Sequence, residues 1–195
     1  MKCVVTGHTS GVGKAIYNHF LSKGWEVIGM SRSNGYNISV DQLKIVKESL
    51  GCDIFVNCAY SDNAQTELLD TLKDKVKNII VIGSVAADWS NEWKDYGKHK
   101  EQLQNRCKEL SLEDNINFAN IFYLKLAFCE NTQWPIFVDE KYKLSFDELL
   151  KVVDVWIEIP KIFSVEFTLK KTLEIDEYIN KKLDDLSLTS FGTLP

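Results

Sequence analysis

Two side chains that can exchange a proton with a bound molecule occur at a spacing that places them together. Tyr96 and Lys100 are four residues apart, so on a helix they share one face. The spacing alone is weak evidence, because Tyr178 and Lys182 form a second such pair on what we interpret as a surface helix. Tyr96 differs because Ser84, at the end of an apolar run, shortly precedes it. We expect Ser84, Tyr96 and Lys100 to meet at one edge of a sheet.

A glycine-rich turn follows the first β-branched run of the chain. It reads Thr6-Gly7-His8-Thr9-Ser10-Gly11-Val12-Gly13, with the glycines spaced Gly-x-x-x-Gly-x-Gly. Glycines let the backbone bend tightly and approach a diphosphate, whose charge is met by N–H groups at a helix N-terminus. The turn therefore predicts a dinucleotide-binding loop. Its binding residues would be Gly7, Thr9, Ser10, Gly11, Val12 and Gly13. The alternative is a glycine-rich connection that holds no ligand.

The residues after the second strand indicate which dinucleotide is bound. An acidic residue there hydrogen-bonds the ribose 2′-hydroxyl of NAD, whereas a basic one accommodates the 2′-phosphate of NADP. The sequence has Ser31-Arg32-Ser33 and no carboxylate at this point, and a guanidinium suits bidentate phosphate binding. Ser31 and Arg32 therefore favour NADP(H) over NAD(H). The alternative is that Arg32 is solvated on a surface loop.

The elements that must position these residues alternate along the chain. Strands are expected at Lys2–Thr6, Trp25–Met30, Asp53–Cys58, Asn78–Ser84, Ile116–Tyr123 and Ile162–Thr168. Helices are expected from the glycine turn to Lys23-Gly24 and at Val40–Leu50, Gln65–Lys77, Tyr96–Leu110, Phe146–Ile157 and Glu174–Leu183. This alternation predicts an α/β fold: a Rossmann-type, doubly wound parallel sheet in a three-layer α/β/α arrangement.

Chain length favours one domain spanning 1–195, with 171–195 as a C-terminal extension. The stretch 124–145, which contains Trp134-Pro135, matches no element. We expect it to help form a pocket, since long irregular segments in compact domains are often functional.

Composition excludes several classes of protein. The net charge of −5 comes without a basic stripe, so nucleic acid is not an expected partner. No apolar run approaches the roughly 20 residues of a membrane span, and the N-terminus becomes polar too soon for a signal peptide. The 5 cysteines are scattered, as in a reducing compartment, and the 3 histidines lack metal-ligand spacing. These features predict a cytoplasmic protein without a metal.

Taken together, the motifs resemble those of the short-chain dehydrogenase/reductase family, in a shortened form. The matches are Thr6-Gly7-x-x-x-Gly11-x-Gly13, Asn57-Cys58-Ala59 after the central strand, Ser84, and Tyr96-x-x-x-Lys100. They follow the family's order over roughly residues 1–170. The resemblance implies a Rossmann fold and an NAD(P)(H)-dependent enzyme that interconverts a carbonyl and an alcohol.

The resemblance also implies roles for single residues. Tyr96 would be the general acid/base toward the substrate oxygen, and Ser84 would hydrogen-bond the substrate carbonyl. Lys100 would hold the nicotinamide ribose and lower the pKa of the tyrosine electrostatically. Asn37 and Ile38 would lie beside the adenine, and the cofactor would lie on Cys58, Ala59 and Tyr60. Family members usually self-associate, which makes a homodimer or tetramer an expected assembly.

The sequence departs from the family pattern at several places. Tyr60 replaces a glycine, so its ring would either stack beside the cofactor or narrow the pocket. The family's asparagine on the next helix has no secure match, Asn63 being the one candidate. A Pro-Gly step after the Asn120 strand is missing, and the helix after the second strand is trimmed.

Other residues allow two interpretations. Trp89 and Trp93 would either wall a substrate pocket or pack a loop on the core. His8 would either touch phosphate or face solvent, and we expect the latter; His99 is expected to lie on the surface, facing away from Lys100.

Three functional hypotheses follow. The first is an NADP(H)-preferring oxidoreductase that uses Ser84, Tyr96 and Lys100 on a small carbonyl or alcohol. The second is a dinucleotide-binding regulator or scaffold without useful catalysis, as the departures at Tyr60 and Asn63 would allow. The third is a nucleotide-sugar epimerase or dehydratase, which the short chain disfavours because it leaves little room for a sugar-nucleotide domain.

Overall fold

The computed structural model describes residues 1–113, 117–131, 143–158 and 164–169. The expected C-terminal helix, the extension 171–195 and most of the unassigned stretch, including Trp134, lie outside these residues.

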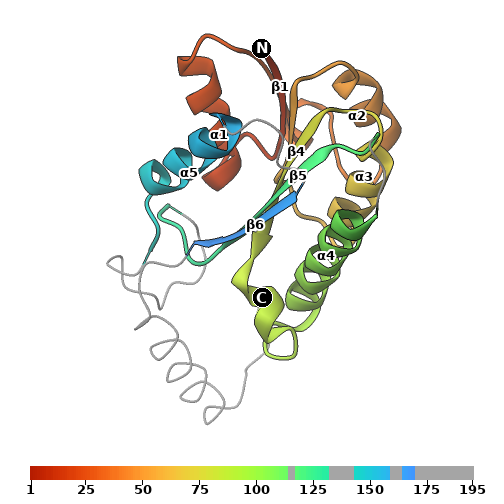
Figure 1. The fold of residues 1–195 in the computed structure, drawn as a ribbon, viewed down its shortest axis with the longest axis vertical. Coiled ribbons are helices and arrows are strands. Elements are labelled where there is room, and N and C mark those ends of the chain that lie inside the picture. Colours follow the sequence, from red (N-terminus) through yellow and green to blue (C-terminus); the bar gives the residue numbers. More distant parts are fainter. Residues whose placement is uncertain (114–116, 132–142, 159–163, 170–195) are drawn as a thin grey trace.

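The described residues form the alternating pattern that the sequence predicts (Figure 1). The strands are β1 Lys2–Thr6, β2 Glu26–Met30, β3 Ile54–Asn57, β4 Asn78–Ser84, β5 Asn120–Leu126 and β6 Ser164–Leu169. The helices are α1 Gly11–Ser22, α2 Gln42–Ser49, α3 Ala64–Leu72, α4 Lys94–Leu112 and α5 Phe146–Glu158, with short 3₁₀ turns η1 Arg32–Asn34 and η2 Val85–Trp89.

Two boundaries differ from expectation in ways that affect the site. β5 runs to Leu126, so Leu124–Leu126 belong to the sheet and not to a loop. The sequence did not reveal this because Lys125 interrupts the apolar run. Its ammonium is nevertheless buried in an ion pair with Asp88, at 2.8 Å. The other difference is α4, which begins at Lys94, so Tyr96 lies inside its first turn.

The sheet is parallel throughout, with strand order β2-β1-β3-β4-β5-β6. The chain leaves β1 toward β2 on one side and then continues from β3 on the other. Ligands of such sheets bind beyond the carboxyl ends of the two adjacent strands from which the chain builds the sheet outward in opposite directions. Here these strands are β1, which ends at Thr6, and β3, which ends at Asn57. The expected Rossmann-type, doubly wound fold is confirmed.

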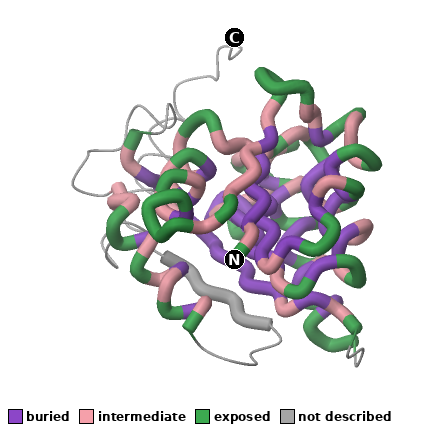
Figure 2. Tube along the Cα trace, turned by 90° about the horizontal axis from the view of Figure 1, so that it is seen from above, coloured by how far each residue is buried: buried purple, intermediate pink, exposed green. Residues whose placement is uncertain are grey.

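Helices cover both faces of the sheet, which gives the expected three layers. One apolar cluster joins the sheet to α2, α3 and α4, and a second joins it to α1 and α5. Figure 2 shows the buried strands running through the centre, with exposed residues on the outer helix faces. The two cores fix the strands, and the strands in turn fix the loops at their carboxyl ends.

The sheet ends at β2, because the trimmed region after it supplies no further strand. The η1 turn folds back beside this edge, where the side-chain Nδ2 of Asn34 donates to the carbonyl of Gly29 at 2.8 Å. Gly35, in a left-handed conformation, closes the turn.

Two kinds of feature are absent from the described residues. No group of three or more histidine, cysteine, aspartate or glutamate side chains there is placed to hold a metal ion. No helix in that part of the chain is long and apolar enough to cross a membrane.

Candidate active site

The glycine turn is folded tightly against the start of α1 and the end of β3. The N–H of Gly7 donates to the Met30 carbonyl at 2.8 Å, and Gly7 has a φ of +74°. A Cβ on Gly13 would lie 2.3 Å from the Gly7 carbonyl oxygen, and one on Gly7 would lie 3.2 Å from the Ala59 backbone. Both positions therefore require glycine, and the first turn of α1 is brought to the carboxyl edge of the sheet.

Thr6 joins the glycine turn to the end of β3. Its hydroxyl donates to the Val56 carbonyl at 3.1 Å and accepts the N–H groups of Cys58 at 2.9 Å and Ala59 at 3.1 Å. Its side chain is fully buried. The sequence placed Thr6 in a motif but gave it no role. Here it sets the backbone on which a ligand would lie.

The remaining residues of the predicted dinucleotide loop lie at the mouth or floor of this edge. Thr9 and Ser10 are exposed, and Val12 lines the cavity described below. Cys58 lies beneath α1, and its thiol accepts a hydrogen bond from the Gly13 N–H. Burial raises the pKa of this thiol to about 11, although the charge of Lys100 opposes the rise. The thiol therefore stays protonated near neutral pH and does not act as a nucleophile.

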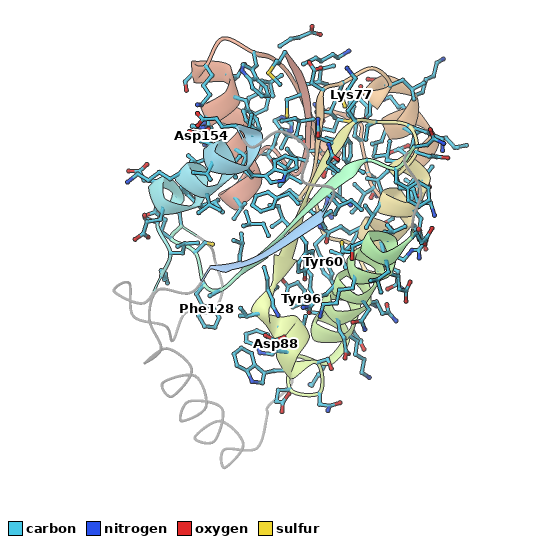
Figure 3. All side chains as sticks on the ribbon, in the orientation of Figure 1. Tyr60, Lys77, Asp88, Tyr96, Phe128 and Asp154 are labelled. Atoms are coloured by element: carbon cyan, nitrogen blue, oxygen red, sulfur yellow. The ribbon has the colours of Figure 1, made fainter. Side chains whose placement is uncertain are left out.

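A cavity of about 450 Å³ opens at the carboxyl ends of β4 and β5. Ser84, Tyr96 and Lys100 all line it, together with Tyr60 and the two tryptophans Trp89 and Trp93. Figure 3 shows Tyr60 and Tyr96 next to each other on the α4 side, with Phe128 across the opening. The structure thus brings the three predicted catalytic residues to one site, and the tryptophans wall it.

Tyr96 and Ser84 are hydrogen-bonded to each other. Burial raises the pKa of Tyr96 above its ordinary value of 10.0, and the hydrogen bond with Ser84 opposes this rise. The Ser84 hydroxyl also accepts the N–H of Ala86 at 3.2 Å. Desolvation outweighs the other effects, so the Tyr96 pKa lies above its ordinary value and not below it as expected, and the electrostatic effect of Lys100 on this hydroxyl stays a prediction. Tyr96 is a protonated hydroxyl at neutral pH.

Lys100 is almost completely buried, with 3% of its surface exposed. Its ammonium donates to the side-chain Oε1 of Gln65 at 2.7 Å and to the Ile82 carbonyl at 3.0 Å. Burial lowers the pKa of Lys100 to about 8, against a smaller opposing effect of Cys58. The ammonium lies 5.7 Å from the centre of the Tyr96 ring.

Gln65 is the residue at this site that the sequence did not reveal. Its amide nitrogen donates to the carbonyls of Asn57 at 2.7 Å and Ile82 at 3.0 Å, while its oxygen holds Lys100. Asn63, the candidate from the sequence, is an exposed residue preceding α3. A glutamine in the first turn of a helix gives no signal that separates it from a surface residue.

Tyr60 lies over Lys100, with 5.5 Å between the ammonium and the ring centre. Its ring meets that of Tyr96 edge-on at 4.8 Å, and its hydroxyl is 3.0 Å from Nδ1 of His99. His99 is half-buried, and this contact with Tyr60 adds to its interpretation as a surface residue. Tyr60 lines the cavity beside Lys100, and the two alternatives that the sequence left open for its ring both stay predictions.

His8 was also expected to face solvent, and it does not. Its ring packs over Gly29, where any side chain would collide with it, and lies 5.1 Å from the ring of Tyr17. Gly29 thus makes room for the histidine at the base of the glycine turn.

The predicted adenine end is more open. Arg32 is exposed and makes no ion pair with any residue that the structure describes. Ser31 is engaged within the η1 turn, its hydroxyl contacting Ser33 at 2.8 Å and Asn34 at 3.2 Å.

The two residues predicted to lie beside the adenine contribute to the local structure here. The Ile38 side chain is 5% exposed within the core, and its position beside an adenine stays a prediction. The N–H of Asn37 donates to Asp41 at 2.8 Å, and its side-chain oxygen accepts from Ser39 at 3.1 Å. Both residues shape the turn before α2.

Comparison with known proteins was informative at the level of family and fold. The family described as "NAD dependent epimerase/dehydratase family" matches residues 3–118. No curated protein matches the sequence. The similar solved structures share the fold of this chain at low sequence identity.

Three of these structures illustrate the likeness. A 3-ketoacyl-(acyl-carrier-protein) reductase from Brucella melitensis complexed with NADH has a TM-score of 0.69 at 16% identity, covering 87% of this chain and 96% of its own. A UDP-N-acetylglucosamine 4-epimerase from Bacillus cereus has a TM-score of 0.67 at 19% identity, covering 94% and 85%. A short-chain dehydrogenase from Streptomyces avermitilis has a TM-score of 0.63 at 12% identity, covering 96% and 93%.

Proposed function

Because the chain belongs to the NAD dependent epimerase/dehydratase family, we propose that it binds a nicotinamide dinucleotide and uses it to interconvert a carbonyl and an alcohol. The observation that carries the proposal is the meeting of Ser84, Tyr96 and Lys100 around one cavity at the carboxyl edge of the sheet. Tyr96 is the general acid/base of the proposed reaction.

The proposed dinucleotide lies across the switch point between β1 and β3. The glycine turn and the first turn of α1 would receive its diphosphate, because the first N–H groups of a helix have no partner inside the helix. Cys58 and Ala59, fixed by Thr6, would support its middle. Several similar solved structures are complexes with such cofactors, including one with NADP+ and one with NADH.

NADP(H) is the proposed preference. Arg32 supports it, since this exposed guanidinium has no carboxylate partner among the described residues and stands where a 2′-phosphate would arrive. Ser31, which precedes Arg32, places a hydroxyl in the same turn.

The protein's own groups would act as follows in the direction of reduction. A nicotinamide dinucleotide held by the glycine turn would provide the hydride that reduction of the carbonyl carbon requires. Ser84 would donate a hydrogen bond to the carbonyl oxygen, and Tyr96, protonated at neutral pH because burial raises its pKa, would give its proton to the developing alkoxide. Lys100, charged below pH 8, would stabilise the tyrosinate that remains.

Dinucleotide binding without catalysis is a second candidate, favoured by the position of Tyr60. Its ring lies over Lys100, and the lysine ammonium already donates two of its three N–H groups, to Gln65 and the Ile82 carbonyl. A cofactor ribose would reach Lys100 only after Tyr60 moved. If that movement does not occur, the fold would hold the dinucleotide without consuming it.

Calorimetric titration with NADPH and NADH, followed by turnover assays over a panel of aldehydes and ketones, separates the candidates. Tyr96→Phe should abolish turnover and leave NADPH affinity within a few-fold of wild type. Arg32→Gln should weaken NADPH at least about tenfold without affecting NADH, and Lys47→Gln is its matched surface control. Undiminished turnover by Tyr96→Phe would refute the mechanism. Cofactor binding without any turnover would favour the second candidate.

A further inference from the structure

The walls of the cavity restrict the molecule that it can receive. Resting on the proposed function, we propose that the substrate is a small uncharged carbonyl compound whose substituent is aryl or alkyl. This excludes keto acids, acyl phosphates and nucleotide sugars as substrates of the site.

Aromatic rings and aliphatic groups form most of the cavity surface. The rings come from η2 and the following loop on one side and from the end of β5 on the other: Trp89, Trp93 and Phe128. Trp93 and Phe128 lie 6.5 Å apart between ring centres, tilted by 44°. Such walls bury apolar surface and give a flat ring favourable contacts.

The sequence provides for these walls through a glycine in α4. A Cβ on Gly97 would lie 2.9 Å from Cβ of Trp93 and 2.8 Å from Cα of Ser90. The absence of a side chain at Gly97 lets the Trp93 segment pack directly on the first turn of α4. Trp93 is thereby held beside Tyr96, next to the proposed site of proton transfer.

Polar groups on the cavity wall are few. The hydroxyls of Ser84 and Tyr96 converge there and suit one carbonyl oxygen. Lys100 is the one charged residue among the described lining residues, and Gln65 and the Ile82 carbonyl already hold its ammonium.

Two charged residues that adjoin lining residues along the chain pair with each other. Asp88 and Lys125 form an ion pair at 2.8 Å, and neither lines the cavity. No free cation among the described lining residues is placed to receive a carboxylate or a phosphate. A charged substituent would therefore lose its hydration without gaining a partner.

The cavity is also small. Its volume of about 450 Å³ lies in the lower half of the range of about 300–1,000 Å³ that is usual for ligand pockets. A nicotinamide ring would occupy part of it, which leaves room for a compound the size of a substituted benzaldehyde.

A matched pair of ligands tests the proposal through binding. Affinities of 4-methylbenzyl alcohol and 4-carboxybenzyl alcohol for the full chain are measured by calorimetry, with and without saturating NADP+. The two have similar shapes and differ in charge. We expect the methyl compound to bind on the order of a hundredfold more tightly. Equal or tighter binding of the carboxylate, or no binding of either by folded protein, would overturn the proposal.

A variant that adds a cation to the wall provides a second test. Phe128→Arg should reduce the preference for the methyl compound at least tenfold, whereas Phe128→Leu should preserve it; circular dichroism verifies folding. An unchanged preference in a folded Phe128→Arg protein would count against the proposal. Reduction of 4-methylbenzaldehyde by NADPH is assayed separately. Binding without reduction would refute the proposed function and leave the selectivity of the cavity standing.

Discussion

Replacing Lys100 by methionine should change how the stability of the protein depends on pH. Methionine has a similar length and no charge, so the variant removes the buried ammonium while its side chain fills the space that the lysine side chain occupied. The loss of the hydrogen bonds to Gln65 and the Ile82 carbonyl adds a constant cost. The pH dependence is the informative part because it reports the charge alone.

The magnitude follows from the pKa of Lys100. Burial lowers it from 10.5 to about 8, so the folded protein releases a proton that the unfolded chain still holds between those values. Stability then rises with pH in this window. The penalty for the buried charge is about 3 kcal/mol at neutral pH and disappears above pH 10.5. Between pH 7.5 and 9.5, wild type should therefore gain about 2 kcal/mol relative to Lys100→Met.

Urea unfolding of both proteins at pH 7.5, 8.5 and 9.5 measures this change. The window is suitable because the pKa values of Tyr96 and Cys58 are raised above it by burial, so these neighbours stay protonated. A difference between the two proteins that stays constant to within about 0.5 kcal/mol would refute the argument. It would show that the lysine is solvated in the folded protein.

Three further substitutions have expected outcomes that urea unfolding can check. Gly13→Ala should destabilise the fold by about 3 kcal/mol, because the added Cβ meets a carbonyl oxygen at 2.3 Å, and should abolish the NADPH binding that calorimetry measures. The control is Gly24→Ala, where φ is +76° and the added Cβ meets open space; it should cost about 1 kcal/mol and leave binding intact. Gln65→Leu removes three buried hydrogen bonds and should cost about 3–4 kcal/mol; a cost below 1 kcal/mol would contradict the network. Asp154→Asn should cost about 1 kcal/mol at pH 7. Burial raises the pKa of this carboxyl, but the hydrogen bonds from the adjoining histidine and lysine outweigh it and lower the pKa below 3.8. The difference in stability between wild type and Asp154→Asn should therefore vanish as pH falls through that lowered pKa.

Much of the site was predictable because it depends on regular periods. The four-residue spacing of Tyr96 and Lys100 places both side chains on the inner part of α4, and the parallel sheet brings the end of β4, with Ser84, to the same edge. The strand–glycine–helix order likewise placed the turn at the switch point. These relations need no knowledge of which side chains touch.

Other contacts were not predictable, because they depend on where two distant segments meet. Gln65 is polar and lies in the first turn of a short helix, a position typical of a surface residue, yet it is 2% exposed. Tyr60 and His99 are 39 residues apart in the chain and contact each other because the segment after β3 and the start of α4 meet at the carboxyl edge of the sheet. Lys125 ended the apparent apolar run, although its burial is compensated by Asp88.

The side-chain hydrogen bond from Asn34 to Gly29 has a consequence for association between molecules. With the trimmed region after it, β2 is the last strand of the sheet, and an uncovered last strand offers its backbone groups to any extended chain that approaches. The Asn34 amide occupies the Gly29 carbonyl in the manner of a neighbouring strand's N–H, and η1 blocks the space beside it. The turn thereby leaves one carbonyl fewer on this edge strand for pairing with an extended segment of another molecule.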